Sequence, residues 1–221
     1  DATQGQIINL TVTGPLGLPV NAFYGVLGQL DEDGNQTAII EMAAASGLHL
    51  VPSTQRNPLL TTSFGTGELI ADALDRGIRH IILGLGGSAT NDAGAGMMQA
   101  LGVKLSDITN TPLPLGGAAL ATLHYIDMQL CHPAIKECVI EVACDVDNPL
   151  CGPRGASAIF GPQKGATTEM VEQLDLALGH FAHVINQHLN QPIDGHCQLH
   201  PGAGAAGGMG FGVMTMLNAT L

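Results

Sequence analysis

Glycines and small polar side chains are concentrated at residues 83–102, in the sequence LGLGGSATNDAGAGMMQALG. An apolar run precedes them and an apolar-periodic run follows, which predicts a strand, a glycine-rich turn and a helix. Glycines let backbone N–H groups turn toward a ligand, and a helix N-terminus adds partial positive charge. This stretch therefore predicts a site for a small anion at Gly86 and Gly87, with hydrogen bonds from Ser88 and Asn91.

This glycine-rich turn is weak evidence when it is taken alone. No GK[ST] triplet follows, so it is not a Walker A loop, and Ala89 stands where a GxGxxG motif requires its last glycine. Ser88, Thr90, Asn91 and Asp92 are also ordinary helix-capping residue types. Residue types alone are compatible with both a ligand site and a simple strand-to-helix turn.

A second polar stretch, TTSFGTGEL at residues 61–69, stands at another expected helix start. Thr66 and Glu68 are its candidates for a place beside a ligand. A helix-capping motif explains the same residue types.

A third stretch, ACDVDNPLCGPRGASAIFGPQKGA, begins where an apolar strand is expected to end. Ligands of α/β proteins bind beyond the carboxyl ends of strands, and Asp145 and Asn148 offer oxygens there for Mg²⁺ or a hydroxyl group. Arg154 and Lys164 are two of only seven basic residues in the chain, which favours an anionic or phosphorylated ligand. An Asx turn with a surface ion pair is the alternative.

Two further features have simpler explanations. The glycine-rich segment PGAGAAGGMG at residues 201–210 either approaches a ligand or lets a helix pack closely. His180 and His183 flank an apolar helical stripe, and we expect them to be solvated rather than metal-bound. Cys144 stands in an apolar strand and is expected to be a buried, inert thiol.

The elements that position these residues follow from hydrophobic periodicity. Residues 7–27 predict two strands around a Gly/Pro turn, and residues 37–43 a third, which together form an antiparallel meander. Residues 62–77 and 93–102 predict helices that end at glycines, with a strand at 79–87 between them. Residues 138–146 predict another buried strand.

A long helix is expected to begin at Thr167 or Thr168. Its apolar stripe has helical spacing and consists of Leu174, Leu178, Phe181, Ile185 and Leu189. A second glycine-rich loop, residues 199–212, is expected to precede the last apolar segment. The order of elements predicts one α/β domain, with a mixed sheet and flanking helices.

Composition limits the classes of function. The 221 residues are 45% hydrophobic and 12% charged, which indicates a packed globular domain. The formal net charge of −12 leaves no basic footprint, so nucleic acids and anionic membranes are not expected partners. The five cysteines form no CxxC pair, which is typical of reduced thiols and predicts a cytoplasmic location.

Several motifs together resemble a known family. They are TVTGPLG, AIIEMAAASGL, RNPLLTTSFGTGELI, GLGGSATNDAGAGMMQALG, EVACDVDNPLCGPRGASAIFGPQKGA and PGAGAAGGMGFG. Their order and spacing closely resemble the bacterial glycerate kinase family, of the glycerate 2-kinase type, along essentially the whole chain. The combination is highly specific, although each loop alone is not.

The resemblance implies transfer of the γ-phosphoryl group of ATP to D-glycerate with Mg²⁺, giving 2-phosphoglycerate. Family members also carry a PDSFK-like and a DGGEGT-like motif before this region, and a TGEGR.D-like motif after it. Those end segments build a Rossmann-like domain, and substrate binds in the cleft between the two domains. Residues 1–221 thus look like the inserted domain of the two-domain architecture, without the Rossmann-like domain. We expect little kinase activity from this chain alone.

Residue chemistry at the family's motif positions gives each candidate a role. Asp92 is the first candidate to orient the reactive hydroxyl and accept its proton, and Asp145 is the second. As an alternative to that role of Asp145, Asp145 and Asn148 are the candidates to hold Mg²⁺. Lys164 and Arg154 are expected to stabilise the transferred phosphoryl group.

The remaining candidates bind the carboxylate of glycerate or a phosphate of ATP, or support that site. They are Gly86, Gly87, Ser88, Asn91, Thr66 and Glu68. Two other functions stay open. The chain is either a non-catalytic domain whose glycines serve packing and docking, or part of a kinase for a related small hydroxy acid.

Overall fold

The computed structural model describes residues 4–188, 197–217 and 219–220. Its first three strands are β1 (Gln6–Thr13), β2 (Pro19–Leu30) and β3 (Gln36–Glu41). They pair in order as an antiparallel meander, which confirms the prediction. Inward-facing residues such as Val12, Ala22 and Tyr24 are buried, so the alternation that predicted these strands also decides which face meets the core.

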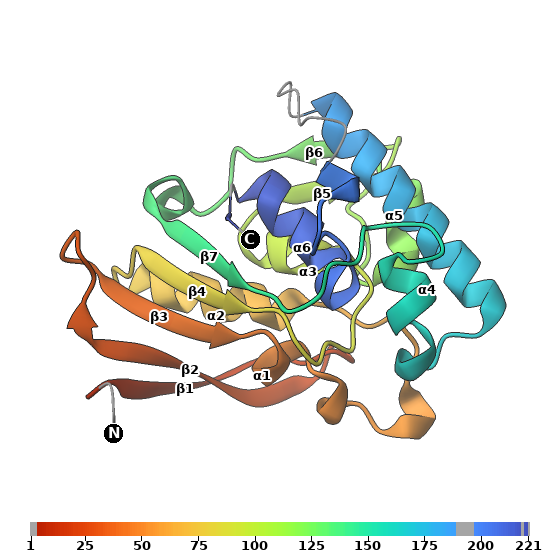
Figure 1. Cartoon of the computed structure of the whole chain (residues 1–221). Helices are drawn as coiled ribbons and strands as arrows, with labels where there is room; N and C mark the ends of the chain where they lie inside the picture. Colours follow the sequence, from red (N-terminus) through yellow and green to blue (C-terminus); the bar gives the residue numbers. More distant parts are fainter. Residues whose placement is uncertain (1–3, 189–196, 218, 221) are drawn as a thin grey trace.

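Two parallel strands extend this meander into a mixed sheet. β4 (His80–Gly84) lies between β3 and β7 (Val139–Ala143), and the strand order is β1-β2-β3-β4-β7. β3, β4 and β7 run in the same direction, as their arrows show in Figure 1. The predicted α/β fold with a mixed sheet and flanking helices is confirmed.

The helices and the smaller elements surround this sheet. The helices are α1 (Ala43–Ser46), α2 (Phe64–Asp75), α3 (Ala95–Ala100), α4 (Ala156–Phe160), α5 (Thr168–His188) and α6 (Ala205–Met216). β5 (Lys104–Ser106) and β6 (Tyr125–Asp127) form a separate two-stranded ribbon. Short 3-10 turns are η1 (Leu48–Leu50), η2 (Ser53–Gln55), η3 (Gly117–Thr122), η4 (Pro133–Glu137), η5 (Pro162–Lys164) and η6 (Cys197–Leu199).

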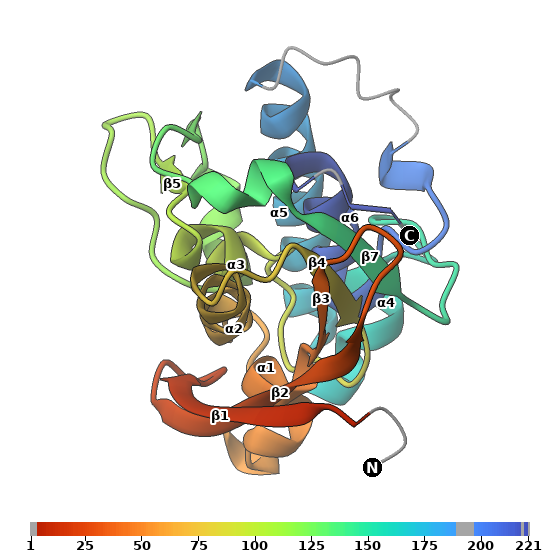
Figure 2. The ribbon, with the colours of Figure 1, turned by 90° about the vertical axis from the view of Figure 1, so that its left-hand side faces the viewer.

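Helices α2 and α3 lie together on one side of β3 and β4 (Figure 2). Both end as the sequence predicts. Gly77 has φ +86° and donates to the Leu74 carbonyl, and Gly102 has φ +92° and donates to the Gln99 carbonyl. A left-handed residue ends a helix at little cost only when it is glycine.

The long helix α5 begins where it was expected. The Thr167 hydroxyl accepts a hydrogen bond from the Met170 N–H at 3.3 Å. The predicted apolar stripe is buried at Leu174, Leu178, Phe181 and Ile185. Leu189, the fifth predicted member of the stripe, lies outside the described residues.

Two local predictions were wrong. The second glycine-rich segment is not a loop up to residue 212, because α6 begins at Ala205 and continues through a left-handed kink at residues 206–208. Burial explains the difference, since nearly all of α6 packs into the core. His180 is not solvated, because its Nε2 forms a partly buried hydrogen bond with the Leu123 carbonyl oxygen at 2.7 Å.

Within the described part of the chain, no helix combines the length and the apolar character needed to span a bilayer.

Candidate functional site

The predicted site segments meet at the carboxyl edge of the parallel strands. Glu41, Gly84 and Ala143 pair across the ends of β3, β4 and β7. The backbone then continues this contact, because Leu85 N–H donates to the Ala143 carbonyl at 2.9 Å. The loops that follow β4 and β7 therefore start side by side.

Gly86 and Gly87, the glycine pair, are the exposed part of the glycine-rich turn. The Gly87 carbonyl accepts a hydrogen bond from Leu48 N–H at 2.8 Å, which fixes the turn to η1. The N–H groups of Gly86 and Gly87 themselves donate to no other described residue. A Cβ at Gly86 would meet nothing within 4 Å, so this backbone faces open space. Two consecutive exposed donors are suited to an anion.

Residues 88–93, which we call the anchored segment, are buried directly after the glycine pair. Ala89 is held at both backbone groups, because its N–H donates to the Ser46 carbonyl and its carbonyl accepts from the Thr61 hydroxyl. Farther along, Ala93 N–H donates to the Gly207 carbonyl at 3.0 Å. The left-handed kink of α6 therefore contacts this segment.

Asp92 is completely buried and joins the starts of two helices. Its Oδ2 accepts hydrogen bonds from both the N–H and the hydroxyl of Ser63, each at 2.8 Å, at the N-terminus of α2. Its carboxylate also accepts longer bonds from Gly94 and Gly96, at the start of α3. Burial raises the pKa of Asp92, and the donated hydrogen bonds oppose that shift. These contacts hold α2 against α3.

Lys164 is also buried, at 1% exposure, and its Nζ donates to the Thr90 carbonyl at 2.6 Å. Burial lowers the pKa of Lys164 to about 7, and the Asp92 carboxylate acts in the opposite direction. The neighbouring Asn91 donates from Nδ2 to the Ser157 hydroxyl at 3.0 Å. Among the described residues, Thr90 Oγ1 and Asn91 Oδ1 are buried without a hydrogen-bond partner.

Thr66 and Glu68 face neighbouring elements of the fold. The Thr66 hydroxyl is buried 2.9 Å from the Ser46 hydroxyl, and Glu68 Oε2 accepts from the Thr13 N–H at 2.6 Å. Both residues thus connect α2 to the segments that flank it. Their predicted place beside a ligand stays a prediction.

The loop after β7, residues 145–154, is the acidic loop of the site. The Asp145 side chain is exposed at the end of the strand. Arg154 contacts both carboxylate oxygens of Asp147 at 3.1 Å, and its carbonyl accepts from Asn148 Nδ2 at 2.8 Å. The acidic loop therefore presents one carboxylate and one guanidinium–carboxylate pair to solvent.

Two further residues at this edge were missed in the sequence. Glu41 ends β3, and its carboxylate lies against Gly84. His49 packs its ring on Gly47, which forms an antiparallel bridge with Ser88. The end of a predicted parallel strand was the available signal for Glu41, whereas His49 is brought here only by tertiary pairing.

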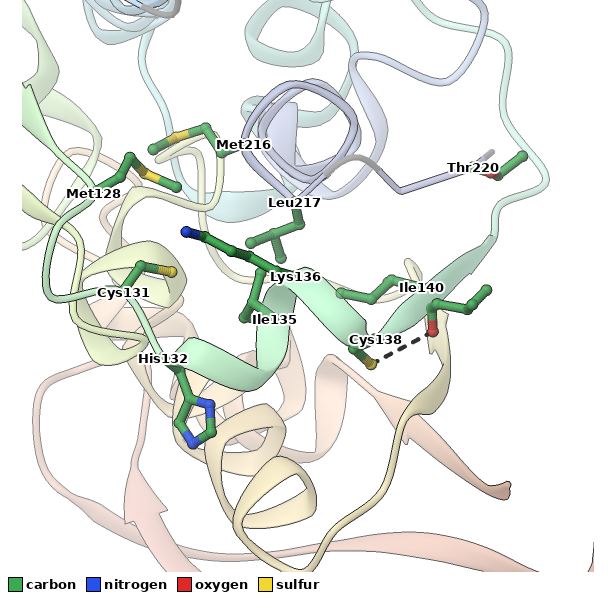
Figure 3. Close-up of a pocket in the computed structure, with 11 residues that line it drawn as sticks. Met128, Cys131, His132, Ile135, Lys136, Cys138, Ile140, Met216, Leu217 and Thr220 are labelled. Carbon is green, nitrogen blue, oxygen red and sulfur yellow. Dashed lines mark hydrogen bonds between the residues drawn. The ribbon is translucent and has the colours of Figure 1, made fainter. Parts of the chain in front are cut away.

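A separate cavity of about 500 Å³ lies at the opposite, amino end of β7 (Figure 3). Its lining mixes polar and apolar surface and is rich in sulfur, from Met128, Cys131, Cys138 and Met216. Burial raises the pKa of Cys131 and that of Cys138, the latter to about 11, so both thiols are neutral at physiological pH. None of the predicted site residues lines this cavity.

The fold and its polar loops define an α/β domain with a ligand edge at the carboxyl ends of its parallel strands, where such domains bind ligands. The sequence model of the glycerate kinase family matches residues 1–221. The chain belongs to the glycerate kinase family.

Individual relatives agree with this assignment. A glycerate kinase from Haemophilus influenzae is 58% identical over 221 residues, and glycerate 2-kinase from Escherichia coli is 56% identical over 220 residues. These alignments cover 100% of this chain but 56% and 55% of the two relatives. The chain therefore spans about half the length of the curated relatives it matches.

A solved structure is similar over the same region. It is a crystal structure from Salmonella typhimurium LT2 whose protein is assigned to glycerate kinase 2, with a TM-score of 0.92 and 55% sequence identity. The match covers 100% of this chain and 57% of that one.

Proposed function

We propose that this chain forms one side of the active site of an ATP-dependent glycerate kinase. A Rossmann-like domain, built from segments before and after residues 1–221, forms the other side. One observation carries the proposal: the glycine pair, with its exposed N–H donors, and the acidic loop follow adjacent strand ends at the carboxyl edge of the sheet, where Leu85 N–H bonds to the Ala143 carbonyl. Anion donors and carboxylates at one edge would support phosphoryl transfer, which depends on positioning and charge stabilisation.

D-Glycerate is the proposed acceptor, and 2-phosphoglycerate the proposed product. The N–H groups of Gly86 and Gly87 hold the glycerate carboxylate or an ATP phosphate. The exposed Asp145 carboxylate orients the reactive hydroxyl and accepts its proton, and Arg154 neutralises charge on the transferred group. The Asp92 and Ser88 roles expected from the sequence remain predictions, because both side chains are buried here.

Mg²⁺ is a further part of this proposal. As the alternative to its role as proton acceptor, the exposed carboxylate of Asp145 and the nearby Asn148 fit a cation that proteins hold through one or two carboxylates together with substrate phosphates. No cluster of three or more His, Cys, Asp or Glu side chains able to hold a metal occurs in the described ranges. When bound, Mg²⁺ would neutralise charge on the phosphates. The unpaired thiols at positions 131, 138, 144 and 151 support a cytoplasmic location, which we also propose.

The test is ADP release in a coupled assay with D-glycerate. The complete protein that contains this chain is expected to turn over, whereas residues 1–221 alone are not. Replacing Gly86 by Pro removes one exposed N–H donor and is expected to raise KM for glycerate or ATP by at least about tenfold. Absence of glycerate-dependent ADP release from the complete protein would contradict the proposal.

A non-catalytic docking domain is the second candidate, and one observation favours it. On the outer face of the meander, Ile7 and Phe23 are 66% and 51% exposed. This face is suited to contact another domain. If Ile7→Ser and Phe23→Ser together abolish association with the Rossmann-like domain, while Gly86→Pro leaves turnover unchanged, docking becomes the better account.

A further inference from the structure

The glycine pair and the acidic loop follow different strands, so something must fix one relative to the other. Their starts meet where Leu85 N–H bonds to the Ala143 carbonyl, but both chains then leave the sheet. The acidic loop leads directly into α4 and η5, residues 156–164. This helical segment returns to the anchored segment and contacts it at two points.

Both contacts are buried hydrogen bonds. The Ser157 hydroxyl of α4 accepts from Asn91 Nδ2 at 3.0 Å, and Lys164 Nζ of η5 donates to the Thr90 carbonyl at 2.6 Å. Neighbouring residues of one segment are thus bonded to the two ends of the other. The pair of contacts ties the segment that carries the acidic loop to the anchored segment at two points. The loop itself is also bonded to other elements, because Gly204 N–H donates to the Asn148 carbonyl and Gly152 N–H donates to the Asp175 carboxylate.

The surroundings of Lys164 hold its side chain in this place. Gly165 follows it with φ +91°, and the Arg56 carbonyl lies so close to Gly165 that a Cβ there would contact it at 2.5 Å. Arg56 also donates from Nη1 to the Gln163 carbonyl at 3.1 Å. The loop before α2 therefore packs against η5, and the Lys164 side chain is buried at 1% exposure.

We propose that Lys164 is a positioning residue that joins the acidic loop to the glycine pair by holding the Thr90 carbonyl, and that it does not contact the ligand. The inference rests on the function proposed above. It replaces the role expected from the sequence, in which Lys164 stabilises the transferred phosphoryl group directly. A buried lysine whose side-chain nitrogen donates to a backbone carbonyl is suited to holding that backbone in place. Small displacements of reacting groups lower reaction rates strongly.

The first test measures amide hydrogen exchange in residues 1–221, in which Lys164→Met removes the donor and Lys136→Met is a control at an exposed lysine. We expect Lys164→Met to lower protection at least tenfold in both residues 88–93 and 145–154, with α5 unchanged. Lys136→Met should change neither loop. Unchanged protection of the two loops in folded Lys164→Met would overturn the inference.

Ser157→Ala provides a second variant, because it removes the other contact without altering any charge. It should loosen the same two loops, to a smaller extent, and it keeps the inference testable if Lys164→Met does not fold. Normal protection from hydrogen exchange in both loops of Ser157→Ala would also contradict the inference that these two contacts together hold the loops.

The second test is steady-state kinetics of the complete protein. If these contacts align the acidic loop with the glycine pair, Lys164→Met should lower kcat by about 10²-fold and Ser157→Ala by about tenfold. KM should change less than about threefold in both variants. A lysine that contacts the phosphoryl group predicts a different result, in which Lys164→Met lowers kcat with normal exchange and Ser157→Ala is fully active. If the wild-type protein does not phosphorylate glycerate, the proposed function fails, while the exchange experiment still decides the positioning role.

Discussion

The glycine pair and the anchored segment are adjacent in sequence but differ in solvent exposure and in hydrogen bonding. Gly86 and Gly87 are exposed, and their N–H groups have no partner among the described residues. Residues 88–93 are buried, and contacts from α1, α2, α4, η5 and α6 reach them. The comparison teaches that polar side chains in a motif need not face the ligand. Here they hold in place a short exposed backbone, to which we assign ligand binding in the proposed function.

The largest expected change in stability comes from a side chain that collides with the anchored segment. Gly207 has φ +72°, and a Cβ there would lie 2.0 Å from the Thr90 carbonyl oxygen. Gly207→Ala is expected to lower the free energy of unfolding by about 4 kcal/mol, from the left-handed backbone and overpacking together. Denaturant titration measures the change. Gly86→Ala is the control, since it has open space, and it should stay within about 0.5 kcal/mol of wild type. Equal losses in both variants would contradict the comparison.

A second pair of variants compares the loss of a buried carboxylate with the loss of an exposed one. Asp92→Ala leaves the buried donors of Ser63, Gly94 and Gly96 unpaired and should cost about 3 kcal/mol of stability. Asp145→Ala is exposed and should cost less than about 0.5 kcal/mol, but should lower kcat of the complete protein by about 10²-fold. Thermal unfolding and ADP release measure the two effects. The distinction fails if Asp92→Ala is as stable as Asp145→Ala.

Lys164 gives the anchored region a dependence on pH. Burial lowers its pKa to about 7 in the folded chain, while the unfolded lysine keeps its ordinary value of 10.5, and the Asp92 carboxylate is the charged group that opposes this shift. Between these values the unfolded state binds more protons, so stability rises with pH. From pH 7 to 8.5 the gain is roughly 1 to 2 kcal/mol.

Urea titrations across this interval, in wild type and Lys164→Met, measure that gain. The difference between the two proteins isolates Lys164 from the histidines. The upper limit of pH 8.5 avoids Cys138 and Cys151, whose raised pKa values act in the opposite sense at higher pH. An identical pH dependence in both proteins would show that Lys164 is not buried as a titrating group.

The smallest effect on stability belongs to Arg154. Its ion pair with Asp147 joins side chains that are 68% and 74% exposed. Arg154→Ala should therefore change the free energy of unfolding by less than about 0.5 kcal/mol. In the complete protein it should weaken ATP or glycerate binding by about tenfold, because a cation faces the proposed phosphoryl group. Calorimetric titration measures the affinity, and Lys136→Ala is a matched control at another exposed cation.

Much of the fold was predictable, because it depends on local patterns. Period-two alternation identified β1 and β2, and glycine stops identified the ends of α2 and α3. The expected end of a strand also predicted that Asp145 and Asn148 follow the carboxyl end of β7. The sequence could not show the kink of α6, because three consecutive left-handed residues are stable only where the surrounding core fixes them.

The division between exposed and buried site residues was not predictable. Asp92 looks like a catalytic acid or base by type, but its partner Ser63 is 29 positions away. Lys164 looks like a phosphate ligand, but its acceptor at Thr90 is 74 positions away. Such contacts depend on tertiary packing, which residue types and short-range spacing do not encode.

A crystal structure of the complete protein with D-glycerate and a non-hydrolysable ATP analogue tests the central claim most directly. The account predicts an anionic ligand oxygen within about 3 Å of the Gly86 or Gly87 nitrogen. It also predicts that the Lys164 ammonium still contacts the Thr90 carbonyl. Ligands held by the cavity of Figure 3, or a glycine pair that touches neither ligand, would contradict it.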